Sequence, residues 1–145
     1  MQRGFLILAK RLWTWALLSC LCVGCTGRAR TANDYRPNAT IARDSLSAVL
    51  TAWKNGAPIG KVENVSPTVQ AVDFQWNAGQ RLQRFEILNE IPGDGPVRFS
   101  VQLVLDDSGT TQDAQYVVLG IDPLWVFRAE DFAKVAAMDH DHSSN

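Results

Sequence analysis

Apolar residues between positions 40 and 55 recur at the spacing of an α-helix. The repeated positions are Ala42, Leu46, Val49, Leu50 and Trp53. Because these residues lie three or four positions apart, with polar residues between them, the segment predicts an amphipathic helix with one apolar face. Asn38 or Thr40 can cap the start of this helix, and Gly56 and Pro58 mark its end.

From residue 82 onward the pattern changes to alternation, which is typical of half-buried strands. The most regular alternation covers Val97 to Leu105, between a loop rich in proline and glycine at 92–96 and a turn at 106–109. Three weaker segments share this character: 82–88, 112–119 and 124–127. Together these segments predict three or four antiparallel strands joined by short turns.

Two further segments complete the predicted order. Residues 59–68 have mixed polarity around Pro67 and predict a loop with at most a short strand. Residues 130–138 predict a terminal helical stretch. The expected fold class is therefore α+β, with one amphipathic helix packed on a curved antiparallel sheet of three to four strands.

The order of one helix followed by antiparallel strands, over residues 40–128, resembles the cystatin-like α+β rolls and the smaller members of the nuclear transport factor superfamily. Three short segments are also similar to uncharacterised small bacterial lipoproteins: Ala52-Trp53-Lys54-Asn55-Gly56, Trp76-Asn77-Ala78-Gly79 and Val126-Phe127-Arg128. The first resemblance implies a sheet curved around a helix. Neither resemblance implies an activity, because enzymes and binding proteins share folds of this kind.

Residues 1–25 have the pattern of an export signal. A basic segment at 3–11 precedes an apolar stretch at 12–24, which suits a signal peptide and is short for a membrane span of ~20 residues. Polar sequence begins directly after Cys25. The segment resembles bacterial lipoprotein signals, in which the thiol of a cysteine that follows a small residue receives diacylglycerol before cleavage. We therefore expect lipid modification at Cys25.

Residues 1–25 also allow three other interpretations. Cys20 follows Leu17-Leu18-Ser19, which has a leucine where the lipoprotein family usually has one. We favour Cys25, because cleavage before Cys20 would leave the apolar residues 21–23 exposed. An uncleaved signal anchor over residues 5–25 is a second alternative, and secretion with loss of all three cysteines is a third.

These patterns divide the chain into four parts. They are a signal peptide at 1–24, a flexible tether at 25–39, a single α+β domain at 40–138 and a disordered polar tail at 139–145. Arg28 and Arg30, in the tether, either favour anionic lipid headgroups or are only solvated.

Charge and cysteine content narrow the possible functions. The chain has 145 residues and a net charge of −1, which becomes −4 without the first 24 residues, because these hold three basic residues and no acidic one. A mildly acidic domain lacks the basic surface of a nucleic-acid-binding protein. All three cysteines lie within the first 25 residues, so the domain has no internal disulfide, thiolate metal site or cysteine nucleophile.

Few side chains are candidates for chemistry. His140 and His142, the only two histidines, lie in the tail, where they are weak candidates for metal ligands. Asp73, Glu86 and Asp122 are the carboxylates with enough apolar neighbours for acid–base catalysis in an apolar site. The sequence shows no nucleophile–base arrangement and no cofactor motif, so we expect a protein without cofactor that is not an enzyme.

Aromatic residues are numerous, and most of them are expected in the core. Trp76, Tyr116 and Trp125 carry polar groups that suit the mouth of a ligand pocket or the rim of an interface. The leading hypothesis is a lipid-anchored cell-envelope protein that faces outside the cytoplasm and binds an envelope protein or other envelope component. The alternatives are a small-molecule carrier with an apolar cone, and an acid–base enzyme built on Asp73 or Glu86.

Overall fold

The structure, a computed structural model, describes residues 32–106 and 109–142. Its elements are η1 (Ala32–Tyr35), α1 (Ala39–Lys54), β1 (Lys61–Val62), β2 (Val69–Val72), α2 (Phe74–Asn77), β3 (Leu82–Ile91), β4 (Val97–Leu105), β5 (Thr110–Gly120), β6 (Leu124–Arg128) and α3 (Ala129–His142). The α+β class is confirmed. The expected numbers of strands and helices were too low, because the described residues form a six-stranded sheet and three α-helices.

The sheet is mixed rather than antiparallel. Its strand order is β1-β2-β6-β5-β4-β3, and the four strands from β3 to β6 form the antiparallel meander that the alternating segments predicted. β2 pairs in parallel with β6, and β1 adds an antiparallel edge. β2 was missed because its four residues lie between Pro67 and Asp73, and so short a segment shows no clear period.

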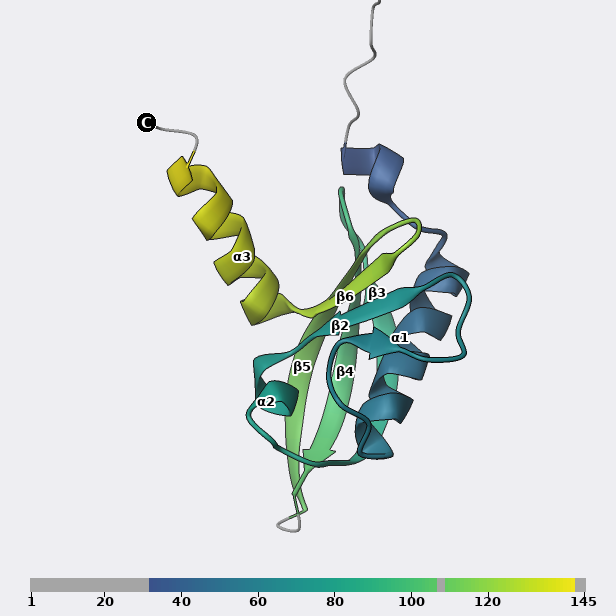
Figure 1. Cartoon of the computed structure of the whole chain (residues 1–145), viewed down its shortest axis with the longest axis vertical. Coiled ribbons are helices and arrows are strands. Elements are labelled where there is room, and N and C mark those ends of the chain that lie inside the picture. The colour runs from purple at the N-terminus through teal and green to yellow at the C-terminus, as the bar shows by residue number, and fades with distance from the viewer. Residues whose placement is uncertain (1–31, 107–108, 143–145) are drawn as a thin grey trace, which may run out of the picture.

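α1 covers one face of the sheet (Figure 1). The helix buries the five apolar residues of its predicted face together with Ser45, and Asn38 caps its start by accepting a hydrogen bond from the Thr40 N–H at 2.8 Å. Opposite the helix lie the inward positions of β4, which include Phe99, Val101 and Leu103. Each large apolar side chain buried in this layer contributes about 1.5–3 kcal/mol, so the helix–sheet interface is the main source of stability.

α3 follows β6 without a break and leads away from the sheet (Figure 1). It packs on the face opposite α1, where the Phe132 ring meets the Phe127 ring edge to face at 5.6 Å. Farther along the helix, Val135 and Met138 are exposed. The helix continues to His142, four residues into the segment that was expected to be a disordered tail.

The end of the expected tether is attached to the domain. Residues 32–35 form the short 3-10 helix η1. The Arg36 guanidinium then donates hydrogen bonds to the carbonyl oxygens of Gly93 and Gly95, at 2.9 and 3.0 Å, and lies 3.5 Å from a carboxylate oxygen of Glu90. Arg36 therefore fixes the entry of the chain to the loop between β3 and β4. The rest of the tether, residues 25–31, lies outside the described residues.

Candidate functional site

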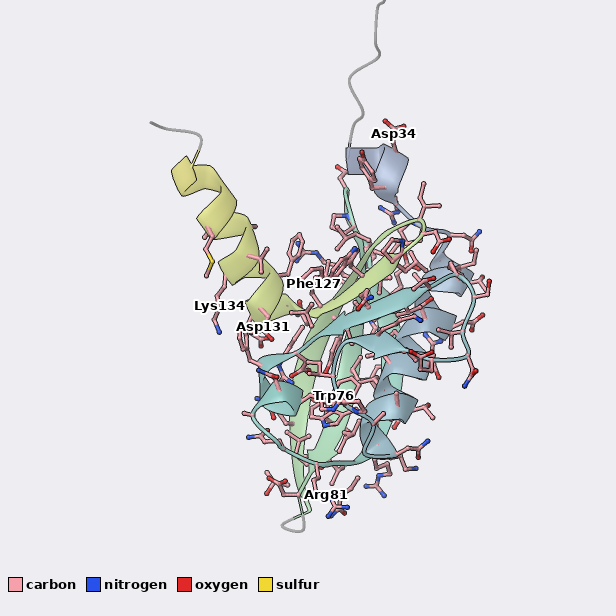
Figure 2. The ribbon with its side chains drawn as sticks, viewed as in Figure 1. Asp34, Trp76, Arg81, Phe127, Asp131 and Lys134 are labelled. Carbon is pink, nitrogen blue, oxygen red and sulfur yellow. The ribbon has the colours of Figure 1, made fainter. Side chains whose placement is uncertain are left out.

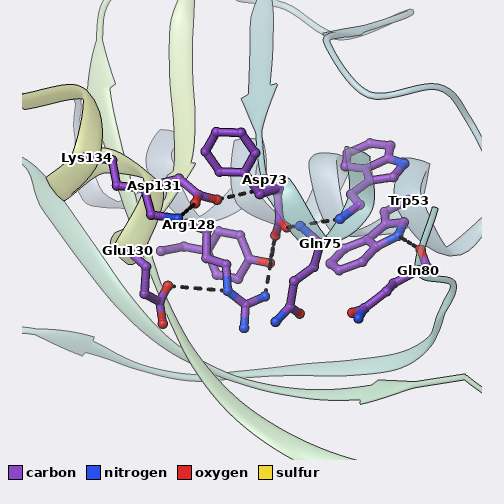
Figure 3. Close-up of polar contacts among 11 residues, drawn as sticks. Trp53, Asp73, Gln75, Gln80, Arg128, Glu130, Asp131 and Lys134 are labelled. Carbon is purple, nitrogen blue, oxygen red and sulfur yellow. Dashed lines mark hydrogen bonds and ion pairs between the residues drawn. The ribbon is translucent and has the colours of Figure 1, made fainter. Parts of the chain in front are cut away.

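Four buried polar side chains form a cluster where β2, β5, β6 and α3 meet (Figure 3). Asp73 follows β2, Tyr116 lies in β5, Arg128 ends β6 and Asp131 belongs to the first turn of α3. Each residue is at most 3% exposed. We call these four residues the polar cluster. Buried charges are stable only when they are paired or hydrogen-bonded, so the partners of each group decide what the cluster can do.

Asp73 is the centre of the polar cluster. Its Oδ1 accepts hydrogen bonds from the backbone N–H groups of Gln75 at 2.8 Å and Trp76 at 3.1 Å, and thereby caps the short helix α2. Its Oδ2 accepts a 2.7 Å hydrogen bond from the Tyr116 hydroxyl and lies 3.6 Å from Arg128 Nη1. Asp73 thus accepts three hydrogen bonds, faces the Arg128 guanidinium and is only 3% exposed, so it is poorly placed to take a proton from a substrate.

Asp131 and Arg128 attach α3 to the rest of the domain. Asp131 Oδ2 accepts a 2.9 Å hydrogen bond from the Phe74 N–H at the start of α2, and its Oδ1 lies 3.4 Å from Lys134 Nζ. Arg128 Nε lies 3.3 Å from a carboxylate oxygen of Glu130, whose side chain is mostly exposed. The polar cluster therefore holds the first turn of α3 against α2 and β6.

The hydroxyl of Tyr116 remains protonated over a wide pH range. Burial raises the pKa of Tyr116 well above its usual value of 10.0, and the negative charge of Asp73 raises that pKa further, while Arg128 lowers it. A protonated phenol can donate the hydrogen bond to Asp73 but cannot act as a base at neutral pH. The electrostatics of the cluster thus favour a structural role for Tyr116.

Some hydrogen-bonding capacity inside the cluster is unused. The terminal nitrogens Nη1 and Nη2 of Arg128 and the Oε1 atom of Gln75 are buried without a hydrogen-bond partner. In the view of Figure 3 the Gln75 amide and the Arg128 guanidinium are both drawn below Asp73. The ion pairs with Asp73 and Glu130 therefore hold the guanidinium more than hydrogen bonds do.

The three carboxylates that the sequence nominated for acid–base chemistry do not come together. Only Asp73 is buried. Glu86 is exposed on β3, opposite Gln102 of β4. Asp122 is exposed in the turn between β5 and β6, where its Oδ1 accepts a 3.2 Å hydrogen bond from the Thr68 N–H. These positions give no pair of carboxylates that could share a substrate.

The three nominated aromatic residues also lie apart. Trp76 is buried, stacks on Trp53 with ring centroids 5.7 Å apart, and donates its indole N–H to the Ala57 carbonyl at 3.0 Å. Tyr116 belongs to the polar cluster. Of the three, Trp125 alone is exposed, at 40% of its surface, so it is the one nominated aromatic side chain that can meet a partner directly.

Trp125 belongs to an aromatic surface on the sheet face opposite α1. Leu124 and Val126 of β6 belong to the core, so the alternating residues Trp125 and Phe127 point to the other face. Their rings stack at 5.9 Å, and Phe132 of α3 packs on Phe127. Figure 2 shows Phe127 between β6 and α3. We call Trp125, Phe127 and Phe132 the aromatic shelf. The last two were not nominated from the sequence, although the alternation in β6 carries the signal for Phe127.

A groove runs along the opposite side of the molecule, beside α1. It consists of two cavities of about 640 and 270 Å³ that share Asp44, Ala48 and Val65 as lining residues. Its floor is largely apolar, while Asp44 and Lys61 lie among the polar groups at its margin. The groove lies outside the core, between α1 and the segment that contains β1.

Some nominated residues lie beyond what the structure describes. Cys20 and Cys25 fall outside the described residues, and so do the side chains of His140 and His142. Within the described part of the chain, no group of three or more His, Cys, Asp or Glu side chains could hold a metal ion. None of the helices in residues 32–106 and 109–142 has the length and apolar character that crossing a bilayer requires.

A scan against protein-family models and searches of curated proteins and of solved structures found no match to this chain. The resemblance to small lipoproteins and to α+β rolls therefore stays a prediction. The contacts, burial and charges described above are the basis for assigning a function.

Proposed function

We propose that this chain is a lipid-anchored protein of the cell envelope, attached through Cys25 and facing outside the cytoplasm. Its domain binds another protein or an envelope component and carries out no catalysis. The observation that carries the proposal is the aromatic shelf, in which the exposed ring of Trp125 stacks on the half-buried Phe127. Exposed aromatic side chains on a fixed surface are a frequent mark of binding sites.

The shelf has the properties of a contact surface. Trp125 offers a large apolar ring with one N–H donor, and its stacking on Phe127 fixes the ring before a partner arrives. Val135, which is also exposed, lies three residues after Phe132 on α3 and therefore on the same side of that helix. Because the polar cluster holds the base of α3, a partner meets a surface that is already ordered, which lowers the entropy cost of binding.

The two alternative functions have less support. An enzyme built on Asp73 would need a free carboxylate in an open site, whereas this group is buried and already accepts three hydrogen bonds. A carrier with an apolar cone would need space between α1 and the sheet, where Leu46, Phe99 and the Trp53–Trp76 stack lie buried instead. A small molecule would have to use the groove beside α1.

The shelf is tested by replacing Trp125 with a photoreactive phenylalanine analogue in the full-length protein. Phe74, which is also exposed but belongs to α2, is the matched control position. We expect one discrete cross-linked partner from position 125 in intact cells and none from position 74, and we expect Trp125→Ala to abolish copurification of that partner. Equal cross-linking from both positions would contradict the role of the shelf.

The anchor is tested separately by the intact mass of the protein extracted from membranes. We expect the wild type to lack residues 1–24 and to carry a diacylglycerol adduct, and Cys25→Ser to abolish that adduct while Cys20→Ser leaves it. Loss of the adduct in Cys20→Ser alone would move the modification to Cys20. An unmodified, uncleaved mass would show that residues 5–25 are a membrane anchor.

A further inference from the structure

Four exposed apolar side chains lie on segments that meet at one end of the molecule. They are Tyr35 in η1, Ile41 in the first turn of α1, Leu88 in β3, and Ile121 in the turn between β5 and β6. We call these four side chains the rim. Figure 1 shows η1, the start of α1, the end of β3 and the β5–β6 turn at the same end. Asp34 lies at this end and Arg81 at the opposite one (Figure 2).

Polar contacts hold the segments of the rim together. Arg36 binds the carbonyl groups of the β3–β4 loop beside η1. Arg43 of α1 donates a 2.8 Å hydrogen bond to the Ile87 carbonyl, next to Leu88. Thr68 joins the β5–β6 turn, because its N–H donates to Asp122 and its carbonyl accepts from the Leu124 N–H at 2.7 Å. These contacts hold in place the backbone of the segments that carry the four rim side chains.

The length of the tether limits how far this end can lie from a membrane. Six residues separate Cys25 from Ala32, and the seven peptide steps between them span at most about 25 Å. The ten residues of β3, which run from the Arg81 end to the rim, span roughly 30 Å. A lipid on Cys25 thus keeps the rim near the bilayer, and the Arg81 end cannot face the lipid while the tether starts from η1.

We infer that the rim rests on the lipid surface, with Tyr35, Ile41, Leu88 and Ile121 at the boundary between headgroups and acyl chains. This inference rests on the proposed lipid anchor and adds the orientation of the domain to it. Tyrosine and aliphatic side chains are the residues that partition into this boundary. Acidic Asp94 and Asp122 and basic Arg36 and Arg98 lie on segments at this same end, so we attribute the association to apolar contact rather than to attraction to anionic lipid.

The absence of cysteine from the domain allows a direct test in the full-length lipoprotein. When the chain is cleaved before Cys25 and the thiol is acylated, an introduced cysteine is the one free thiol of the protein. Ile121→Cys and Arg81→Cys, each labelled with an environment-sensitive fluorophore, are reconstituted in phosphatidylcholine vesicles containing a headgroup spin-labelled lipid. We expect a blue-shifted, strongly quenched emission at position 121 and unchanged emission at position 81.

Flotation of the vesicles separates the two ways in which this test can fail. A protein that floats but is quenched no more at position 121 than at position 81 overturns the orientation and leaves the anchor intact. A protein that does not float overturns the anchor and the orientation together. In Arg36→Ala we expect unchanged flotation and a smaller difference in quenching between the two positions. An unchanged difference would show that the hydrogen bonds from Arg36 to the Gly93 and Gly95 carbonyls do not help to orient the domain on the vesicle.

Discussion

The charge of Asp73 holds the polar cluster together, and Asp73→Asn removes that charge while keeping most of the local geometry. Asparagine is as good a helix cap as aspartate, so its side-chain oxygen can still accept the N–H groups of Gln75 and Trp76. The side-chain amide then points donor hydrogens toward Tyr116 and Arg128, which are donors themselves. The substitution therefore isolates the loss of the buried ion pair from the loss of the cap.

The expected cost of this substitution is large. Removing one partner of a buried ion pair leaves the other charge uncompensated, which costs about 3–5 kcal/mol. Arg128 is 3% exposed and keeps only the ion pair with Glu130, whose carboxylate is mostly in solvent, so water cannot replace Asp73. At about 4 °C per kcal/mol for a domain of this size, the midpoint of thermal unfolding falls by roughly 10–20 °C.

Urea unfolding followed by tryptophan fluorescence measures this cost, because Trp76 lies in α2, three residues after Asp73, and its backbone N–H donates to the Asp73 carboxylate. Asp122→Asn is the matched control, since this carboxylate is exposed and we expect an effect within about 0.5 kcal/mol. The double variant Asp73→Asn with Arg128→Met should be less destabilised than the sum of the two single variants. If Asp73→Asn costs no more than Asp122→Asn, the ion pair does not hold the cluster.

Two further predictions concern pH and a turn. Because burial raises the pKa of Tyr116, the stability that its protonated hydroxyl contributes is present below about pH 10 and is lost as the pH rises through the higher pKa of the folded state. In Tyr35→Phe, where Tyr116 is the one remaining tyrosine, tyrosinate absorbance should appear together with unfolding, and ionisation of the folded protein near pH 10 would contradict this. Gly120 has φ +95°, and an added Cβ would lie 2.6 Å from the Pro123 carbonyl oxygen, whereas Gly56 has φ +76° and open space. Gly120→Ala should therefore cost roughly 1–3 kcal/mol more than Gly56→Ala in urea unfolding, and equal costs would show that the turn relaxes freely.

The sequence predicted the elements that repeat over many residues. α1 buries Leu46, Val49 and Trp53 on the face that its spacing indicated, and β4 has the alternation of the segment from Val97 to Leu105. Both patterns are local, so each can be read without knowledge of the rest of the fold. β2 and α2, of four residues each, are too short for a period to emerge. The parallel pairing of β2 with β6 joins segments about 55 residues apart and has no local signal.

The candidate site was predicted only in part. Asp73 and Tyr116 were both named, but for separate roles, and the hydrogen bond that joins them spans 43 positions of sequence. Arg128 was missed as a member of the site. Its signal is the alternation of β6, where Arg128 takes the inward position after Leu124 and Val126. An arginine at the end of a run of inward apolar residues needs a buried partner, and only the strand pairing identifies that partner.

The register of β2 and β6 explains why the polar cluster lies where it does. Val72 pairs with Phe127, so the next step along both strands brings Asp73 opposite Arg128, at the inward end of the parallel pair. A slip of one residue in either strand would turn the charged side chain of that strand to the other face of the sheet, away from its partner. A buried ion pair adds little net stability over apolar residues, but it strongly penalises such misalignment. We therefore interpret the polar cluster as the set of contacts that fixes the pairing register of β2 with β6. Because Asp131 extends the same cluster into α3, the register also sets where α3 leaves the sheet, and with it the position of Phe132 beside Trp125 and Phe127.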